Sequence, residues 1–370
     1  MSAEFDIVVV GAGIAGASIA AELAPHAKVA LLEAEDQPGY HSTGRSAAFW
    51  AETYGGPKVQ PLTSASGPWL EQHGFLTARG ALNIGRAGQE SRIETMLRDF
   101  SAAGVRIEAL DRAALERRLP GLLPEWRCGA WEPDCRDIDV AGLLAHYLAA
   151  ARQAGVTLHT RARVMRIERG AIWRLITASG SDFSAALVVN ASGAWADEIA
   201  RLAGVPPIGL QPMRRTIAQI RTRPEAPSDL PLVIDVEGSF YFKPEGGRIW
   251  LSPHDETPVT PCDAAAEEID VALAIDRMQR VVDWRVERVE HRWAGLRTFA
   301  PDRLPVYGRD PERPEFFWFA GQGGFGIQTA PAAARLAARL ILGLPPDGLC
   351  TGIDPAIYDP ARFARQARNR

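Results

Sequence analysis

The stretch Phe5-Asp6-Ile7-Val8-Val9-Val10-Gly11-Ala12-Gly13-Ile14-Ala15-Gly16, followed by Glu33, decides the fold of the first part of this chain. Its β-branched run ends at a glycine, which is typical of a buried parallel strand. Residues 14–23 are rich in alanine and predict a helix packed closely on a sheet, with Pro25 after its end. Residues 28–32 predict a second strand. The order strand, glycine turn, helix, strand indicates a nucleotide-binding α/β fold.

Each glycine of the turn has a separate task. Gly11 permits the sharp turn, Gly13 lets the backbone approach a pyrophosphate, and Gly16 lets the helix lie against the strand. The phosphates then meet free N–H groups at the positive end of a helix. Glu33 lies at the end of the second strand, where its carboxylate can accept both ribose hydroxyls. A glycine turn that only packs tightly is the alternative, but all these parts in register predict a dinucleotide site.

The composition excludes several classes of protein. At 370 residues the chain exceeds the usual size of one hydrophobic core, so we expect two packed lobes. A formal net charge of -4 gives no electrostatic reason to expect a nucleic-acid partner. No apolar run approaches the ~20 residues that span a bilayer. The N-terminus has no basic segment followed by an apolar core, so we expect a cytoplasmic protein.

The cysteines and histidines predict no metal site. Six residues lie between Cys128 and Cys135, while Cys262 and Cys350 stand alone, and none has the paired spacing of a zinc or redox motif. The seven histidines are scattered, with no His-x-x-x-His pair. We therefore expect buried thiols without a chemical task, and no metal.

The flanking sequence favours FAD over NAD. After Glu33 the chain enters the small, polar stretch 37–48, whose N–H and hydroxyl groups can meet phosphate oxygens and flavin edges. Residues 321–328, with four glycines, precede the last long helix, whose N-terminus could stabilise negative charge on a reduced flavin. The alternatives are an ordinary surface loop and a flexible turn.

Cofactor-type segments lie at the start, middle and end of the chain. We therefore expect an α/β fold with a discontinuous Rossmann-like FAD-binding domain and a mixed α+β substrate domain. The FAD-binding domain is predicted to comprise residues 1–80, 140–205 and 293–370, and the substrate domain residues 81–139 and 206–292. Outside the first 33 residues, helices are predicted at 91–100, 111–119 and 332–342, and strands at 173–177, 186–190, 240–251 and 316–320.

At these segments the chain resembles the D-amino-acid oxidase superfamily of flavoproteins, which includes glycine and sarcosine oxidases, and most of all its bacterial D-arginine dehydrogenase branch. The resemblance implies noncovalent FAD and a substrate lobe whose sheet roofs the flavin. It is carried by residues 11–16, 38–48, 190–195, 209–212, 239–241, 293–297 and 322–328, in the family's order. The FAD contacts that it implies are Gly11, Gly13, Ala15, Gly16, Glu33, Ala34, Ser42, Thr43, Gly44, Arg45, Ser46, Ala47, Ala48, Val164, Gly193, Gly323, Gly324, Phe325, Gly326, Ile327 and Gln328.

The resemblance also implies a substrate site. Arg297 and Arg215 match residues that grip the substrate carboxylate, and an arginine fork suits a carboxylate because it offers two parallel charge-assisted hydrogen bonds. Tyr54 and Tyr241 match tyrosines beside the substrate. On residue type alone, Arg297 is also compatible with a surface salt bridge. Arg214 is a neighbour whose side chain should face the opposite side of a strand.

Four further residues are expected in the substrate pocket, namely Phe49, Ala81, Gly295 and Gln328. Two of them depart from the branch that prefers arginine. Ala81 stands where that branch carries a glutamate, and Phe49 replaces a histidine. Both changes make the pocket more apolar, so a cationic side chain loses its partner.

We therefore expect hydride transfer from Cα of a small D-amino acid, neutral or apolar, to flavin N5, giving a 2-oxo acid and ammonia. Oxidation of a secondary amine such as sarcosine or proline is one alternative. A flavin-bearing electron-transfer subunit without a substrate site is another. The segment that matches the oxygen-activating lysine of sarcosine-oxidase-like relatives, residues 248–252, contains no lysine, although Lys243 lies nearby. The expected electron acceptor is therefore a quinone or another acceptor besides oxygen, which would allow peripheral contact with a membrane.

Overall fold

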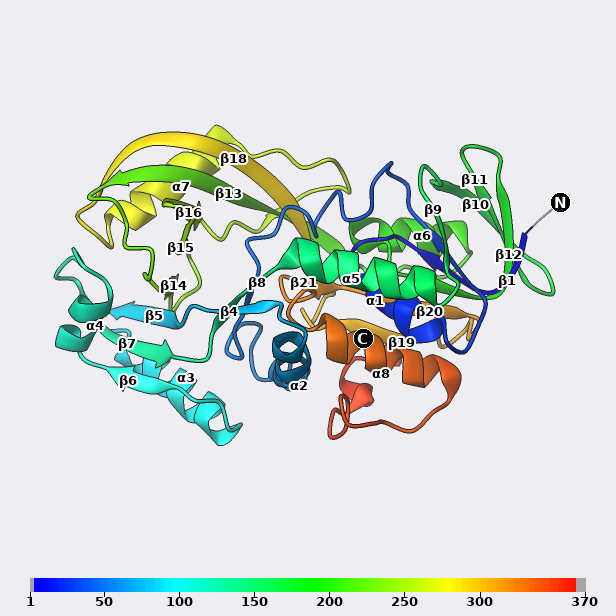
Figure 1. Ribbon diagram of the computed structural model, residues 1–370, viewed down its shortest axis with the longest axis horizontal. Coiled ribbons are helices and arrows are strands. Elements are labelled where there is room, and N and C mark those ends of the chain that lie inside the picture. The colour runs from blue at the N-terminus through cyan, green and yellow to red at the C-terminus, as the bar shows by residue number, and fades with distance from the viewer. Residues whose placement is uncertain (1–2, 364–370) are drawn as a thin grey trace.

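The computed structural model describes residues 3–363, and two large sheets dominate it (Figure 1). The eight-stranded sheet has the order β10-β11-β12-β1-β2-β9, and β20 joins β12 and β19. Its strands are β1 (Ala3–Val10), β2 (Val29–Leu32), β9 (Thr157–His159), β10 (Val164–Arg169), β11 (Trp173–Thr177), β12 (Asp182–Asn190), β19 (Val306–Arg309) and β20 (Phe316–Ala320).

The first strand of this sheet is buried on both faces. β1 pairs in parallel with β12 and β2, and both Val8 and Val9 are fully buried. Near-continuous burial explains why the strand is β-branched throughout. One face is covered by α1 (Ile14–Leu23), α5 (Val140–Gln153) and α8 (Ala330–Leu342), while α6 (Ala196–Leu202) lies on the other (Figure 1).

The ten-stranded sheet follows the order β21-β18-β13-β16-β15-β14-β5-β7-β6, with β17 paired to β13. Its long antiparallel pair β13–β18 forms the arch at the upper left of Figure 1, with α7 (Glu268–Gln279) packed against it. The strands are β5 (Ala81–Arg86), β6 (Glu108–Leu110), β7 (Trp126–Glu132), β13 (Gln211–Arg223), β14 (Leu232–Asp235), β15 (Tyr241–Glu245), β16 (Arg248–Ser252), β17 (Thr257–Pro258), β18 (Arg285–Phe299) and β21 (Gln322–Gly323).

The remaining elements cover and connect these sheets. The helices α3 (Glu90–Ala102) and α4 (Arg112–Arg118) pack on β7. A small third sheet joins β3 (Phe49–Trp50), β8 (Arg136–Ile138) and β4 (Leu76–Ala78). The others are α2 (Gln60–Gln72) and the 3₁₀ turns Gly193–Trp195 and Pro355–Ile357. No helix within residues 3–363 has the length and apolar character needed to cross a membrane.

The predicted elements agree closely with this architecture. The first helix, β11 and β20 have the predicted bounds, and the segment 240–251 is a hairpin of two strands. The predicted domain boundary at residue 293 falls inside β18, which stays in the ten-stranded sheet to Phe299 because it pairs with β13 along its whole length. The division into two domains stays a prediction.

Candidate active site

A long cavity of about 420 Å³ begins at the glycine turn after β1 and extends between the two sheets. Its lining includes Val164 and Met165 of β10 as well as Arg297 and Thr298 of β18. The lining residues are up to 317 positions apart in the chain, from Val10 to Ile327. A cavity lined by parts of both sheets suits a large ligand.

The glycine turn has the close contacts that were predicted for it. A side chain on Gly16 would place its Cβ 1.7 Å from the carbonyl oxygen of Gly11, so only glycine lets α1 approach the strand here. Gly11 has φ +100°, a conformation that favours glycine. The Glu33 carboxylate accepts the N–H of Ala12 at 2.8 Å, which holds the acidic residue against the turn.

Fourteen of the predicted FAD contacts line this cavity and seven do not. Those that line it are Gly11, Gly13, Ala15, Glu33, Ala34, Ser42, Thr43, Ser46, Val164, Gly193, Gly323, Gly324, Gly326 and Ile327. Those outside its lining are Gly16, Gly44, Arg45, Ala47, Ala48, Phe325 and Gln328.

Two of the residues outside the lining have clear structural tasks. The Arg45 guanidinium donates to the carbonyls of Ala264 and Ala294 and pairs with Asp263. It therefore ties the polar loop to the other sheet. Gln328 donates to the carbonyl of Tyr54 at 3.0 Å and accepts from Ala51, so it holds the segment that carries Tyr54.

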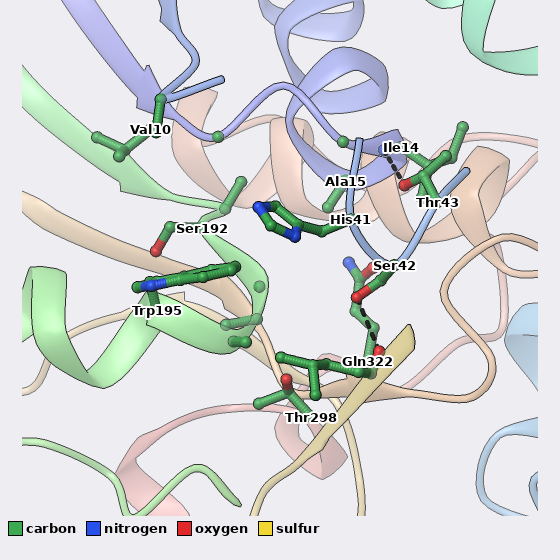
Figure 2. Close-up of a pocket in the computed structure, with 18 of the residues that line it drawn as sticks. Val10, Ile14, Ala15, His41, Ser42, Thr43, Ser192, Trp195, Thr298 and Gln322 are labelled. Carbon is green, nitrogen blue, oxygen red and sulfur yellow. Dashed lines mark hydrogen bonds between the residues drawn. The ribbon is translucent and has the colours of Figure 1, made fainter. Parts of the chain in front are cut away.

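His41 and Trp195 were missed as site residues. Their rings lie 4.6 Å apart, and both face the cavity beside Ser192 (Figure 2). The Glu35 carboxylate lies 3.0 Å from Nε2 of His41. Both rings stand in stretches that carry the family resemblance, but nothing in the sequence indicates that the two stretches meet.

Arg297 is a buried cation without a protein anion. Its side chain is 7% exposed and lines the cavity. Among the described residues it forms no salt bridge, and its one hydrogen bond goes to the carbonyl of its neighbour Leu296 at 3.1 Å. Burial lowers the pKa of Arg297, and the positive charge of Arg215 lowers it further. A guanidinium stays protonated in proteins, so this site attracts an anion.

Arg215 and Arg214 face opposite sides of β13, as strand alternation requires. Arg215 is 2% exposed and donates to the carbonyl of Asp255 at 2.9 Å, to Glu256 at 3.2 Å and to the Tyr54 hydroxyl at 3.5 Å. Arg214 instead pairs with Glu267, the residue before α7, and with Asp270 of α7. Arg215 therefore belongs to the tyrosine cluster, and Arg214 fastens α7 to the sheet.

The predicted aromatic residues meet in one cluster. The ring of Phe49 lies 5.0 Å from that of Tyr54 and 6.0 Å from that of Tyr241. Burial raises the pKa of Tyr241, while the charge of Arg215 opposes that shift. Gly295 lies beside Arg297, because a Cβ there would lie 3.1 Å from a guanidinium nitrogen of that arginine.

His254 completes the cluster and was not predicted. Its Nε2 lies 3.5 Å from the Tyr54 hydroxyl, and its Nδ1 contacts the carbonyl of Gly238, which requires the proton on Nδ1. Burial and then the charge of Arg215 lower the pKa of His254 to about 3. The ring is therefore neutral at pH 7. No motif marks this histidine, since its neighbours come from distant strands.

Ala81 lies beside the aromatic cluster but at the wall of neither large cavity. It is fully buried with Phe49, Tyr241, Ile217 and Leu232. The surroundings of Ala81 in this cluster are apolar.

The thiols and carboxylates form no metal site in the described part of the chain, where no group of three or more His, Cys, Asp or Glu side chains could hold an ion. Cys135 and Cys350 are buried, as expected. The expectation is wrong for Cys262, which is exposed in the segment between β17 and α7. None of the four cysteines lines the long cavity.

These features fit FAD. The pyrophosphate would lie at the glycine turn, the adenosine half near Val164, and the flavin near Arg297 and Gly324. The FAD dependent oxidoreductase (DAO) family matches residues 6–340, and the chain belongs to this family of FAD-binding oxidoreductases. The predicted fold class and the predicted cofactor are thereby confirmed.

Individual relatives resemble the chain over nearly its whole length. A glycine oxidase from Geobacillus kaustophilus (strain HTA426) is 26% identical over 365 residues, covering 92% of this chain and 94% of the oxidase. The crystal structure of glycine oxidase from Geobacillus kaustophilus has a TM-score of 0.85 at 23% identity and covers 98% of this chain and 99% of its own. That of L-proline dehydrogenase from P. horikoshii has a TM-score of 0.84 at 22% identity, covering 99% of both chains. At such identities the two crystal structures show the shared fold alone.

Proposed function

We propose that the protein oxidises the Cα–N bond of an amino acid, preferably a D-amino acid with a neutral or apolar side chain. The product would be an imino acid, which water hydrolyses to a 2-oxo acid and ammonia. Bound FAD supplies the acceptor for the hydride that leaves Cα. The electron-transfer alternative, with no substrate site, is disfavoured by the buried and unpaired Arg297.

Arg297 is the observation that carries this proposal. A buried guanidinium at a cavity wall, with no carboxylate partner in residues 3–363, is costly unless a ligand supplies the anion. The carboxylate of an amino acid fits that requirement through a charge-assisted pair of hydrogen bonds. Arg215 lies close enough to add positive potential, and Tyr241 supplies a wall beside it. Holding the carboxylate fixes the orientation of Cα and its hydrogen.

None of the four side chains proposed to contact the substrate, Arg297, Arg215, Tyr54 and Tyr241, is a carboxylate base. The neutral His254 ring has its Nε2 toward the Tyr54 hydroxyl, and its pKa of about 3 makes it a weak proton acceptor. We therefore propose that the substrate amine loses its proton on binding. Two neighbouring guanidinium groups favour this loss, since they disfavour another positive charge nearby.

The apolar cluster supports a neutral side chain. Phe49, Ala81, Ile217 and Leu232 form one buried apolar cluster with Tyr241. A cationic substrate side chain there would lose its hydration without gaining an anionic partner, which costs free energy. The D configuration comes from the family resemblance. Oxidation of a secondary amine is the alternative, supported by the fold shared with an L-proline dehydrogenase.

An anaerobic substrate screen tests the proposal. Purified holoenzyme is mixed with D- and L-enantiomers of leucine, methionine and phenylalanine, and with glycine, sarcosine and L-proline, while the flavin absorbance is followed. We expect the neutral D-amino acids to bleach the flavin fastest. Faster bleaching by sarcosine or L-proline would establish the secondary-amine alternative, and no bleaching by any amine would refute the proposal.

The position of Lys243 supports a proposal about the electron acceptor. Its side chain is 3% exposed, and its ammonium donates to Asp137 at 2.7 Å and lies 3.2 Å from Glu245. Both carboxylates hold this charge, and Lys243 does not line the long cavity. We propose a quinone-like acceptor and expect turnover with a quinone or dye to exceed turnover with oxygen. Rapid stoichiometric release of hydrogen peroxide in air would contradict this dehydrogenase assignment.

A further inference from the structure

A second cavity of about 560 Å³ adjoins the aromatic cluster, and we refer to it as the distal cavity. Tyr54 and His254 form part of its wall, and α3, β5 and β14 supply most of the rest. Because Tyr54 also reaches Arg215 and approaches Gly324, it stands between the distal cavity and the long cavity. A substrate bound at Arg297 that extends past Tyr54 would enter this space.

Asn83 of β5 lines the distal cavity and is 4% exposed. Its side-chain nitrogen Nδ2 finds no hydrogen-bond partner within residues 3–363. A buried amide donor without a partner lowers stability, and native proteins keep such groups rarely and usually for a purpose. Asn83 also shares a strand face with Ala81, two residues earlier, since side chains alternate along a strand. Along this face of β5, Ala81 of the apolar cluster is therefore followed by Asn83, whose Nδ2 is the donor without a partner.

The charged side chains in the wall of the distal cavity limit which charge a ligand there can carry. Asp235 lines the distal cavity and is buried, but its carboxylate already accepts from the hydroxyl and N–H of Ser239 and from the N–H of Glu237. It disfavours an anionic ligand. Arg92 lies in the same wall and pairs with Glu237 at 3.2 Å, so the wall carries charges of both signs. A neutral group that accepts a hydrogen bond fits these surroundings best.

We propose that the distal cavity binds the far end of the substrate side chain and that Nδ2 of Asn83 donates to an uncharged acceptor there, such as a carboxamide oxygen. This proposal rests on the proposed function and narrows its substrate class to neutral amino acids with a polar end. Asn83 is then a specificity-determining residue. It selects among side chains, whereas Arg297 binds the group that all amino acids share.

The test compares D-glutamine with D-methionine, which has a similar length but a weak acceptor. In the wild type, kcat/KM for D-glutamine should exceed that for D-methionine, D-glutamate and D-lysine. Asn83→Leu should reduce the glutamine-to-methionine ratio about ten-fold, the effect expected from one hydrogen bond that leaves a polar group unpaired. The control Ser101→Ala removes an exposed hydroxyl from α3 outside the cavity and should leave the ratio unchanged.

Thermal stability separates a binding role from a structural one. If Nδ2 is kept for a ligand, Asn83→Leu should unfold at the same temperature as the wild type or about 2 °C higher, because the unpaired donor is gone. Asn83→Ala, which adds no bulk, replaces Asn83→Leu if the latter fails to fold. An unchanged ratio in a folded variant, or a wild type that prefers D-lysine or D-glutamate, would overturn the proposal. Bleaching by no amino acid at all would refute the proposed function itself, and with it this inference.

Discussion

Within residues 3–363, Arg297 has no acidic partner and Nδ2 of Asn83 has no hydrogen-bond partner, and each of these buried side chains lines a cavity. The two differ in what the sequence reveals. Arg297 stands in a stretch that resembles other flavoenzymes, and this resemblance predicts that it binds the substrate. Asn83 is an ordinary strand residue by type, and its lack of a partner depends on α3 and β14 being placed around it. His254 was missed for the same reason, because its partners Tyr54 and Gly238 come from distant segments.

Replacing Arg297 tests its role at the residue scale. Arg297→Ala should lower kcat/KM by about two to three orders of magnitude, since losing one partner of a buried charged pair costs ~2–4 kcal/mol. The kcat/KM of Arg297→Lys should lie between those of the wild type and Arg297→Ala, because an ammonium keeps the charge but cannot reproduce the planar fork. Steady-state kinetics with the best amino acid of the screen measures both, and the FAD content should stay unchanged.

Arg285→Ala is the matched control for these variants. Arg285 is exposed and begins the same strand, β18, far from the cavity. Its kinetics should equal those of the wild type. Wild-type kcat/KM in Arg297→Ala would show that the arginine serves only the structure.

The segment that carries Tyr54 is held from two sides. The Glu132 carboxylate, at the end of β7, accepts the N–H of Glu52 and the hydroxyl of Thr53, both at 2.6 Å. Gln328 holds the carbonyl of Tyr54 from the other side. The position of the segment that carries Tyr54 therefore depends on a fully buried glutamate of the ten-stranded sheet.

Glu132 makes stability depend on pH. Burial raises its pKa from 4.5 to about 7, against the lowering effect of the hydrogen bonds. Because the folded-state pKa is the higher one, the unfolded chain releases this proton first. Stability should therefore fall as the pH rises from about 4.5 to 7 and level off above, by ~3 kcal/mol from this group. In Glu132→Gln, this contribution to the pH dependence of the free energy of unfolding should vanish. Denaturant unfolding at several pH values measures it.

Glu125→Gln provides the comparison, since Glu125 is exposed just before β7. Its unfolding free energy should follow the wild-type pH dependence. If the free energy of unfolding depended on pH in the same way in the wild type and in Glu132→Gln, Glu132 would not be the source of this pH dependence.

The elements that local patterns define could be predicted, while the partners across the large sheet could not. β1, α1 and β20 have strong apolar or alanine-rich runs bounded by glycine. By contrast, β14 pairs in parallel with β5, so Leu232 lies opposite Ala81 across about 150 residues of chain. No local signal encodes that pairing, and it is this pairing that places Asn83 beside Ile234 at the distal cavity.

At the scale of the whole molecule, the long cavity joins the two large sheets. The turn after β1 belongs to the eight-stranded sheet, and Leu296, Arg297 and Thr298 belong to the ten-stranded one (Figure 1). The loop 42–45 adds a second link, since the Ser42 hydroxyl donates to the carbonyl of Leu296 at 2.7 Å. A cofactor in this cavity would lie between the two large sheets, and its removal should weaken their contact.

FAD should accordingly be released intact by denaturation and should raise the thermal stability when it is returned. No cysteine lines the cavity, so we expect no thioether link, and acid-precipitated protein should be colourless with FAD in the supernatant. A ligand at 100 times its Kd stabilises the folded state by ~2.7 kcal/mol, so the Tm of the apoprotein should rise with FAD concentration. FMN should raise it less, because it cannot fill the end beside Val164, and NAD should leave it unchanged. Flavin that stays on the precipitated protein, or an equal shift with NAD, would contradict this picture, because both halves of FAD are needed to span the distance from β10 to β18.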